Sequence, residues 1–519
     1  MSIIMFKYGL DTLTVGKVLE ILRGLLKGVI NKETIEKVNI SHNIVLNTSK
    51  KDKAVYGINT GFGPLCDTII SKDKTSELQR KILLSHSVGV GNPIDQDIAK
   101  LMLILKVHSL SQGFSGISIE VLDRILWHIE NDVIPMVPEQ GSVGASGDLC
   151  PLSHLFLPLI GEGEVYYKNE LVPTQEVLNK FKLKALPLHP KAGLALINGT
   201  QFILAHAVMV VDKLYNCLSH ADLIGSLMIE GLMGSQMPFH KELHQTRPFK
   251  GNIHVAGRMR NFLNNSEIGN SHENCDKVQD PYSLRCIPQV HGSSRNAWLH
   301  LKECVEIELN SVTDNPIIIS EELIISGGSF HGQPLAMPLD YACLAAAELG
   351  SISDRRTYLS LEGKYKGTPR LLLKETGLNS GFMILQYTTA ALVSENKGLC
   401  FPASADSIPT SLGQEDHVSM GSISGRKALR VINNLEKILA IELLCAAQAF
   451  DFRKPLKSST ILDEVHTLIR ENIEHTTEDR IFALDIKKAI SILKSNSLLD
   501  ITKKYMNSYS EFDTEFETY

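Results

Sequence analysis

Apolar residues recur at intervals of three or four through much of the second part of the chain, which is the spacing of one helix face. The segment 202–232 is apolar nearly all round, as is typical of a helix inside a bundle or at a subunit interface. We therefore expect a long buried helix there, and further long helices that each bury one face. Two apolar stripes mark these further helices: Trp298, Leu301, Val305 and Leu309, and Ile432, Leu435, Leu439, Leu443 and Ala446.

The first part of the chain, up to Gly199, mixes shorter helical patterns with glycine-rich loops. Residues 162–172 predict a β-hairpin with its turn at Lys168 and Asn169, because residues typical of strands flank that pair. The glycine loops make this part irregular, so we expect it to form a region separate from the helices that follow.

Further along, Pro338 is expected in the first turn of a helix that continues to about Arg356, where its missing N–H is harmless. The acidic tail 508–519 is expected to fray. These patterns predict a mainly α protein, with a long central helical bundle over residues 200–519. A looped N-terminal cap region over residues 1–199 precedes the bundle.

Composition narrows the class of protein. The 519 residues carry a formal net charge of −6, which argues against nucleic acid or an anionic membrane as a partner. Lys7, Asp11 and Lys17 interrupt the N-terminus, and polar residues interrupt the apolar stretches 202–211 and 438–450, so neither a signal peptide nor a membrane span is expected. The nine cysteines lack a Cys-x-x-Cys pair, which predicts free thiols in the cytoplasm and no zinc site.

The segment 141–149, Gly-Ser-Val-Gly-Ala-Ser-Gly-Asp-Leu, carries the main chemical signal. Its glycines let the chain bend back on itself without Cβ clashes. In such a bend the amide nitrogen of Gly147 can attack the carbonyl carbon of Ala145. Loss of two waters, one from the Ser146 side chain, then leaves an electron-poor five-membered ring whose exocyclic methylene accepts an amine. The alternative is a tight turn before a helix, with Asp148 near the helix start.

Loops in the first part of the chain hold further polar candidates. Residues 56–63 begin with Tyr56, which is either a general base, if its surroundings lower its pKa, or an aromatic anchor of the loop. Residues 85–91 contain His86, which either hydrogen-bonds a polar substrate ring or has a structural role. Asn198 ends an apolar run, where it either caps the following helix or points its amide into a site.

Polar segments in the second part of the chain add to these. Residues 279–285 contain Arg285, a planar fork for a carboxylate, and Tyr282, a second candidate acid or base. Residues 404–420 contain the dense polar run 414–417 between apolar helices. A solvated turn and a solvated loop are the alternatives for these two segments. The chain has no glycine-rich phosphate loop and no defensible Ser-His-Asp arrangement.

The loop 145–149, together with the Tyr56 and Asn198 loops, resembles the aromatic amino acid ammonia-lyase family, and the similarity extends from about Tyr56 to Pro455. The resemblance implies a long helical bundle beneath a looped cap. It also implies a homotetramer in which three subunits build each active site. The implied cofactor is a 4-methylidene-imidazole-5-one, with no metal required, that forms autocatalytically from Ala145, Ser146 and Gly147.

Within the family, the run 414–420 is similar to that of histidine ammonia-lyases, which carry a glutamate at the position of Glu415. Phenylalanine and tyrosine lyases usually show Asn-Gln-Asp there. The pair Ser85 and His86 points the same way. A carboxylate complements an imidazole, whereas a phenyl ring would leave the charge buried and unpaired. The resemblance thus implies elimination of ammonia from L-histidine to give trans-urocanate.

The resemblance also assigns roles in catalysis. Tyr56 removes a β-proton of the substrate, Tyr282 assists, and Ser146 supplies the electrophilic carbon. Arg285 pairs with the substrate carboxylate, and Phe330 packs near the ring. The implied substrate-binding residues are His86, Asn198, Gln279, Arg285, Phe330 and Glu415.

A few positions depart from the family pattern, namely Ser329, Gly332, Gln333 and Gly413. Because their family counterparts line or flank the pocket, a tyrosine or phenylalanine lyase or an aminomutase stays open as an alternative. A non-catalytic helical scaffold is the alternative from another class of protein.

Overall fold

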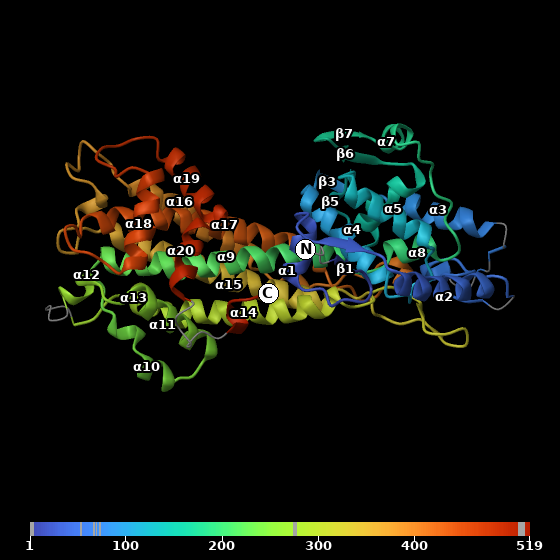
Figure 1. The fold of residues 1–519 in the computed structure, drawn as a ribbon, viewed down its shortest axis with the longest axis horizontal. Helices are drawn as coiled ribbons and strands as arrows, with labels where there is room; N and C mark the ends of the chain where they lie inside the picture. Colours follow the sequence, from blue (N-terminus) through green and yellow to red (C-terminus); the bar gives the residue numbers. More distant parts are fainter. Residues whose placement is uncertain are drawn as a thin grey trace. The chain divides into compact units, whose positions relative to one another are not determined.

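The structure is a computed structural model that describes residues 5–51, 54–65, 68, 70–71, 74–272, 278–506 and 514–519. The chain divides into two compact units. Unit 1 comprises residues 1–209, 302–339 and 402–426, and unit 2 comprises residues 210–301, 340–401 and 427–519. Helices dominate both units, which confirms the mainly α fold (Figure 1). The division into domains at residue 199 remains a prediction.

Unit 1 is built around α4 (Gln96–Leu110), an apolar helix that is buried along nearly its whole length. The predicted hairpin is confirmed, because β6 (Glu164–Tyr167) pairs antiparallel with β7 (Glu170–Pro173). Lys168 and Asn169 between them have φ of 53° and 66°, as a two-residue hairpin turn requires. The other elements lying wholly within unit 1 are β1 (Met5–Lys7), α1 (Val15–Leu22), β2 (Lys27–Val29), α2 (Lys32–Thr48), α3 (Thr75–His86), β3 (Val90–Pro93), α5 (Ile119–Glu130), β4 (Ile134–Pro135), β5 (Pro138–Gln140), α6 (Leu149–Phe156), α7 (Thr174–Lys180), α8 (Ala192–Ile197), β8 (Ile317–Ile318) and β9 (Ile324–Ile325).

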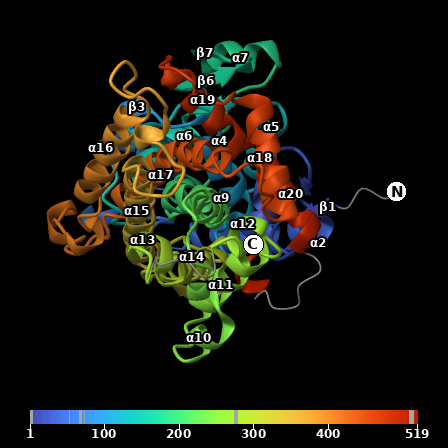
Figure 2. The ribbon, with the colours of Figure 1, turned by 90° about the vertical axis from the view of Figure 1, so that its left-hand side faces the viewer.

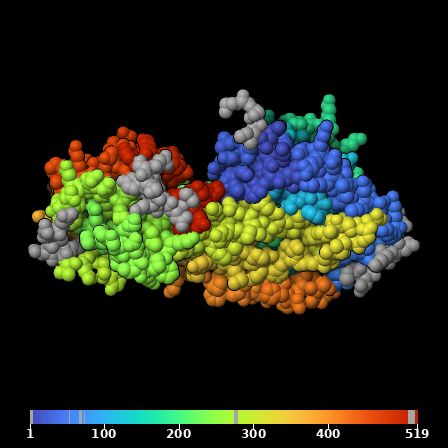
Figure 3. All heavy atoms as spheres, turned by 60° about the horizontal axis from the view of Figure 1, so that its bottom comes forward, coloured from blue at the N-terminus to red at the C-terminus, as the bar shows by residue number. Residues whose placement is uncertain are grey.

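Distant parts of the sequence meet in unit 1. Val45, Ile58 and Ile318 form one buried apolar cluster. From outside, blue N-terminal residues border a yellow part of the chain (Figure 3). The small hairpin of β8 and β9 in that stretch was not predicted. Short 3₁₀ segments of unit 1 are η1 (Gly63–Leu65), η3 (Leu157–Ile160), η6 (Ala403–Ala405) and η7 (Ser411–Gly413).

Long helices begin in one unit and end in the other, and they include the apolar stripes predicted from the sequence. Within unit 2, α9 lies in the middle of the other helices (Figures 1 and 2). Trp298, Leu301 and Ile432 are at most 1% exposed, as expected for core positions. The long helices are α9 (Gln201–Gly231), α14 (Ile287–Leu309), α15 (Gln333–Leu361) and α17 (Gly421–Asp451).

The predicted start of the helix at Pro338 is wrong. Helix α15 begins at Gln333, so Pro338 lies in its second turn and Pro334 occupies the first turn, where a missing N–H is harmless. Among the described residues, α9 and α15 are long and apolar enough to cross a membrane. Their apolar windows are 72% and 67% buried, so packing within the protein explains this composition.

Unit 2 buries ion pairs as well as apolar residues. Asp222 accepts hydrogen bonds from Arg258 and Arg295, at 2.9 and 2.6 Å. Arg258 also donates to Glu517, and Phe516 is fully buried, so the predicted fraying is wrong for residues 514–519. The rest of the predicted tail, 508–513, lies outside the described residues. The other elements of unit 2 are η4 (Met237–Phe239), α10 (Lys241–Gln245), α11 (Lys250–Phe262), α12 (Glu267–Asn270), α13 (Tyr282–Arg285), η5 (Arg370–Leu372), α16 (Met383–Leu399), α18 (Thr460–Asn472), α19 (Phe482–Ser495), α20 (Ser497–Met506) and η8 (Thr514–Phe516).

Candidate active site

The Ala-Ser-Gly turn lies in unit 1, between β5 and α6. Gly147 has a φ of 73°, and a Cβ added there would lie 2.1 Å from the carbonyl oxygen of Gly199. Only glycine fits this position without displacing the neighbouring chain. The amide of Asp148 donates to the Gly199 carbonyl at 2.8 Å, and the amide of Gly199 makes a long contact of 3.5 Å with the carbonyl oxygen of Ser146. The 198–199 segment therefore supports the turn from behind.

The residue before Ser146 is held equally firmly. Ala145 packs in a buried cluster with Val418 and Met420. The hydroxyl of Ser419 donates to the Gly144 carbonyl at 3.2 Å. Both neighbours of Ser146 are thus fixed, while Ser146 itself is half-buried and borders open space.

Asp148 links this turn to the start of α9. It precedes α6, as predicted, but its carboxylate does not cap that helix. Instead, Oδ2 accepts the backbone amides of Phe202 and Ile203 at 3.1 and 3.0 Å, and Oδ1 accepts the hydroxyl of Ser142 at 3.1 Å. Burial raises the pKa of Asp148 to about 7, although these hydrogen bonds oppose the rise. The carboxylate satisfies amides at a helix N-terminus and fixes the turn to that helix.

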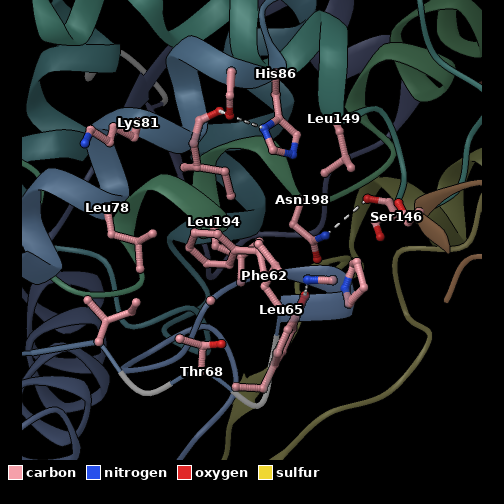
Figure 4. A pocket seen from close by; sticks show the side chains of 18 of the residues that line it. Phe62, Leu65, Thr68, Leu78, Lys81, His86, Ser146, Leu149, Leu194 and Asn198 are labelled. Carbon is pink, nitrogen blue, oxygen red and sulfur yellow. Dashed lines mark hydrogen bonds between the residues drawn. The ribbon is translucent and has the colours of Figure 1, made fainter.

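In the part of unit 1 that the structure describes, Ser146 borders two hollows, of about 850 and 370 Å³. Apolar side chains such as Phe62 and Leu194 line the larger one (Figure 4), whereas Phe330 lines the smaller one. An apolar wall with a few polar groups is typical of a small-molecule site. Lining residues common to both hollows are Tyr56, Gly63, Ser146, Asn198 and Glu415.

Asn198 points its side chain at the turn. It follows α8 in an extended conformation, and its Nδ2 donates to the carbonyl oxygen of Ser146 at 3.2 Å (Figure 4). Its Oδ1 is buried and has no hydrogen-bond partner, so it is an acceptor available to a ligand. Asp148, rather than Asn198, takes the first amides of α9, which rules out the capping alternative for Asn198. Tyr56 is half-buried, and its hydroxyl accepts the amide of Gly63 at 3.4 Å.

Glu415 contacts the side chain of Ser146. Its Oε1 accepts the Ser146 hydroxyl at 2.8 Å, and its Oε2 accepts the hydroxyls of Thr410 and Ser411 at 2.8 and 2.9 Å. His86, the last residue of α3, contacts the hydroxyl of Ser85 through Nδ1 at 3.0 Å. Burial lowers the pKa of His86, while a backbone hydrogen bond and the charge of Glu415 oppose the shift. Burial thus favours the neutral form of His86, which can both donate and accept a hydrogen bond.

The predicted residues of the 279–285 segment belong to unit 2 and line neither hollow. Tyr282 is 71% exposed, and Gln279 is exposed as well. The guanidinium of Arg285 lies 4.6 Å from the centre of the Tyr282 ring, and its Nε has no hydrogen-bond partner. Unit 1 thus brings together several of the predicted site residues. The residues brought together are Tyr56, His86, Ser146, Asn198, Phe330 and Glu415.

Sequence reasoning missed residues that position the site. Thr410 and Ser411 were overlooked because hydroxyls in a loop carry no distinct pattern. Lys106 was also missed, although a lysine within the apolar run 101–110 is a recognisable signal. The positions that depart from the family pattern line neither hollow. These positions are Ser329, Gly332, Gln333 and Gly413.

The hydrogen-bond donors and the packing around Ser146 fit an electrophilic ring made from the Ala-Ser-Gly turn itself. Gly147 has a conformation that suits glycine, Ala145 is held in a buried cluster and two donors bind the Ser146 carbonyl, an arrangement that is compatible with a self-cyclising turn. Within the described residues, no group of three or more metal-ligating side chains could hold an ion. Around Ser146, whose carbonyl is hydrogen-bonded, the site combines three side-chain groups. They are the carboxylate of Glu415, the imidazole of His86 and the phenol of Tyr56.

The aromatic amino acid lyase family matches residues 13–471, and the chain belongs to this family. A histidine ammonia-lyase of Myxococcus xanthus (strain DK1622) is 43% identical over 490 residues, which cover 94% of this chain and 96% of that protein. The crystal structure of histidine ammonia-lyase from Trypanosoma cruzi has a TM-score of 0.89 at 38% identity and covers 96% of this chain and 95% of that one. A tyrosine aminomutase from Streptomyces globisporus has a TM-score of 0.90 at 33% identity and covers 97% and 99% of the two chains.

Proposed function

We propose that this protein is a histidine ammonia-lyase that converts L-histidine to trans-urocanate and ammonia. The observation that carries the proposal is Glu415, whose carboxylate lies 2.8 Å from the Ser146 hydroxyl at the edge of a largely apolar hollow. A carboxylate there suits a substrate with an imidazole N–H. Relatives named histidine ammonia-lyase that match almost the whole chain support the same substrate.

The cofactor is a methylidene-imidazolone made from Ala145, Ser146 and Gly147. In its formation the Gly147 nitrogen bonds to the Ala145 carbonyl carbon, whose oxygen leaves as water, and the Ser146 hydroxyl leaves with the Cα proton as a second water. Once formed, the group supplies an electron-poor carbon that takes up the substrate amine and makes it a better leaving group. Loss of the Ser146 hydroxyl also releases Oε1 of Glu415 from its hydrogen bond.

The side chains around the turn then bind and deprotonate the substrate. Glu415 accepts the imidazole N–H, and His86 hydrogen-bonds the same ring. Oδ1 of Asn198 is free to accept from the substrate. Tyr56 takes the weakly acidic β-proton, for which a pre-positioned base is required. Phe330 packs against the ring.

Arg285, Tyr282 and Gln279 complete the site from neighbouring subunits of a homotetramer. The exposure of Tyr282 supports this arrangement. Co-expression of Ser146→Ala and Arg285→Ala chains tests it, because mixed tetramers then contain some sites with both native residues. Activity well above that of either variant alone is the expected result. Activity no higher than the sum of the two would show that Arg285 does not serve a site whose Ser146 belongs to another subunit.

The proposed substrate is a small amino acid, with no nucleic acid or membrane partner, and we place the enzyme in the cytoplasm. All cysteines that the structure describes are free thiols, as suits that compartment.

Parallel ultraviolet assays with L-histidine, L-tyrosine and L-phenylalanine test the substrate. Product from histidine alone is expected, whereas product only from one of the others would overturn the role of Glu415. A β-amino acid product would identify an aminomutase, the activity named for one similar structure.

Intact-protein mass tests the cofactor separately. The wild-type chain is expected to lack the mass of two waters, and Ser146→Ala is expected to prevent that loss and reduce the rate by orders of magnitude. Ser153→Ala is the matched control, because that buried hydroxyl only donates to the Leu149 carbonyl. An unmodified, inactive wild-type chain would favour the non-catalytic scaffold.

A further inference from the structure

Lys106 is a buried lysine beside the residue pair that supports the Ala-Ser-Gly turn. It lies on α4 among apolar residues and is 1% exposed. Its Nζ donates to the carbonyl oxygen of Asn198 at 2.5 Å and to Oε1 of Gln201 at 3.4 Å. Burying an ammonium group is costly, so its retention in an apolar helix calls for a specific interaction.

The Asn198 carbonyl is one end of a peptide group whose other end faces Ser146. The N–H of that peptide group belongs to Gly199 and contacts the Ser146 carbonyl oxygen at 3.5 Å. The Asn198 side chain donates to the same oxygen at 3.2 Å. Both donors to this oxygen therefore belong to the residue pair that Lys106 holds.

This arrangement has an electrostatic consequence. The positive charge polarises the 198–199 peptide group, which makes its N–H a stronger donor toward Ser146. The Ser146 carbonyl becomes the ring carbonyl of the cofactor, and its oxygen takes up electron density when a nucleophile bonds to the former Ser146 Cβ. Fixed donors aimed at an oxygen that gains charge lower the barrier to such a step.

We propose that Lys106 is a positioning residue that activates the electrophile by holding and polarising the peptide group between Asn198 and Gly199. This inference rests on the proposed function, because it presupposes the ring. Charged groups around Lys106 include Asp314, Lys191 and Asp148. Lys191 is engaged elsewhere, with Asp314 at 2.5 Å and the Ser115 carbonyl at 3.0 Å.

The test separates charge from hydrogen bonding at this position. Lys106→Arg keeps both, Lys106→Gln keeps only a donor, and Lys106→Met keeps neither. Thr200→Val is the matched control, because it removes a buried hydroxyl hydrogen bond to Glu308 from the same segment without touching the Asn198 carbonyl. Each variant is measured for intact mass, for the near-ultraviolet absorbance of the ring, and for the rate of cyanide addition. In that addition the cyanide carbon bonds to the former Ser146 Cβ and a solvent proton completes the product.

We expect the arginine variant to match the wild type, and the glutamine and methionine variants to show a shifted ring absorbance. Their cyanide addition is expected to be roughly 10- to 100-fold slower. Burial lowers the pKa of Lys106 to about 7, with Asp314 and Asp148 opposing the shift and Lys191 adding to it. The ratio of the wild-type rate of cyanide addition to that of Lys106→Met is therefore expected to fall between about pH 6 and about pH 8, while the same ratio for the arginine variant stays constant.

Other outcomes overturn the inference. A glutamine variant with wild-type absorbance and addition rate would show that charge is not involved, and this comparison stands even if the methionine variant does not fold. An equal effect from Thr200→Val would show that Lys106 contributes only to packing of this segment. If the wild-type chain keeps the mass of both waters, the proposed cofactor itself is wrong. This result differs from a ring that forms but whose absorbance and addition rate do not depend on Lys106.

Discussion

Replacing Glu415 by glutamine tests whether the charge of this side chain selects the substrate. The side chain keeps its shape but exchanges one carboxylate oxygen for an amide nitrogen that donates and does not accept. The two oxygens of Glu415 accept hydroxyls from Ser146, Thr410 and Ser411. If the nitrogen faces the loop hydroxyls, both lose their acceptor, and if it faces the pocket, it opposes the imidazole N–H of the substrate.

The expected decrease in kcat/KM for histidine follows from the loss of one charged hydrogen bond. Such a bond contributes roughly 1.5–3 kcal/mol, so kcat/KM for histidine is expected to fall roughly 10- to 150-fold. Residual turnover of tyrosine or phenylalanine is expected to change less, because neither ring presents an imidazole N–H to Glu415.

The assay measures kcat/KM for all three amino acids with the wild type, Glu415→Gln and Asp406→Asn. Asp406 is the matched control, since it is an exposed carboxylate of the same loop that lines neither hollow. Equal losses on every substrate for Glu415→Gln would refute its role as selector. Intact mass checks that the ring has formed, so that a failure of cyclisation is not mistaken for lost recognition.

The remaining predictions concern the turn and the C-terminus. Gly147→Ala combines a left-handed φ with a Cβ 2.1 Å from a carbonyl oxygen, so we expect the intact mass to retain both waters. The control is Gly413→Ala, where φ is 87° and the added Cβ has no atom within 4 Å, and it is expected only to lower Tm slightly. Because burial raises the pKa of Asp148 to about 7, the folded state binds more protons than the unfolded state between about pH 4 and about pH 7, and stability falls as pH rises through that window. The Tm of Asp148→Asn relative to the wild type is therefore expected to increase from pH 5 to pH 7, and a constant difference would contradict a raised pKa. Glu517→Ala is expected to lower Tm by an amount equivalent to about 3 kcal/mol, because it removes a partner of the buried Arg258.

Much of the local structure was predictable from the sequence. Apolar spacing indicated the long helices, because a helix that buries one face must repeat its apolar residues every three or four positions. The hairpin at 164–173 was predictable because residues on either side of Lys168 and Asn169 favour strands. The Ala-Ser-Gly segment alone also fits a tight turn before a helix, and the match to the family made its chemistry specific.

Other features depended on contacts between distant residues. The start of α15 was misplaced because the sequence around it contains two prolines, and only packing selects which one occupies the first turn. Asp148 was expected to act near its own helix, yet its carboxylate caps α9, more than fifty residues away. The ordered end at 516–519 likewise results from burial of Phe516 and pairing of Glu517, which no local pattern encodes.

The sequence by itself determined the fold class, because helix periodicity is a local property, and its resemblance to the family supplied the candidate turn and site residues. Tertiary structure decided which of those residues meet. Glu415 reaches Ser146 across a sequence separation of 269 residues, and Lys106 reaches Asn198 across 92. Such contacts arise when the buried faces of separate elements pack together, and the free energy that selects one packing is shared among many residues rather than encoded in any single segment.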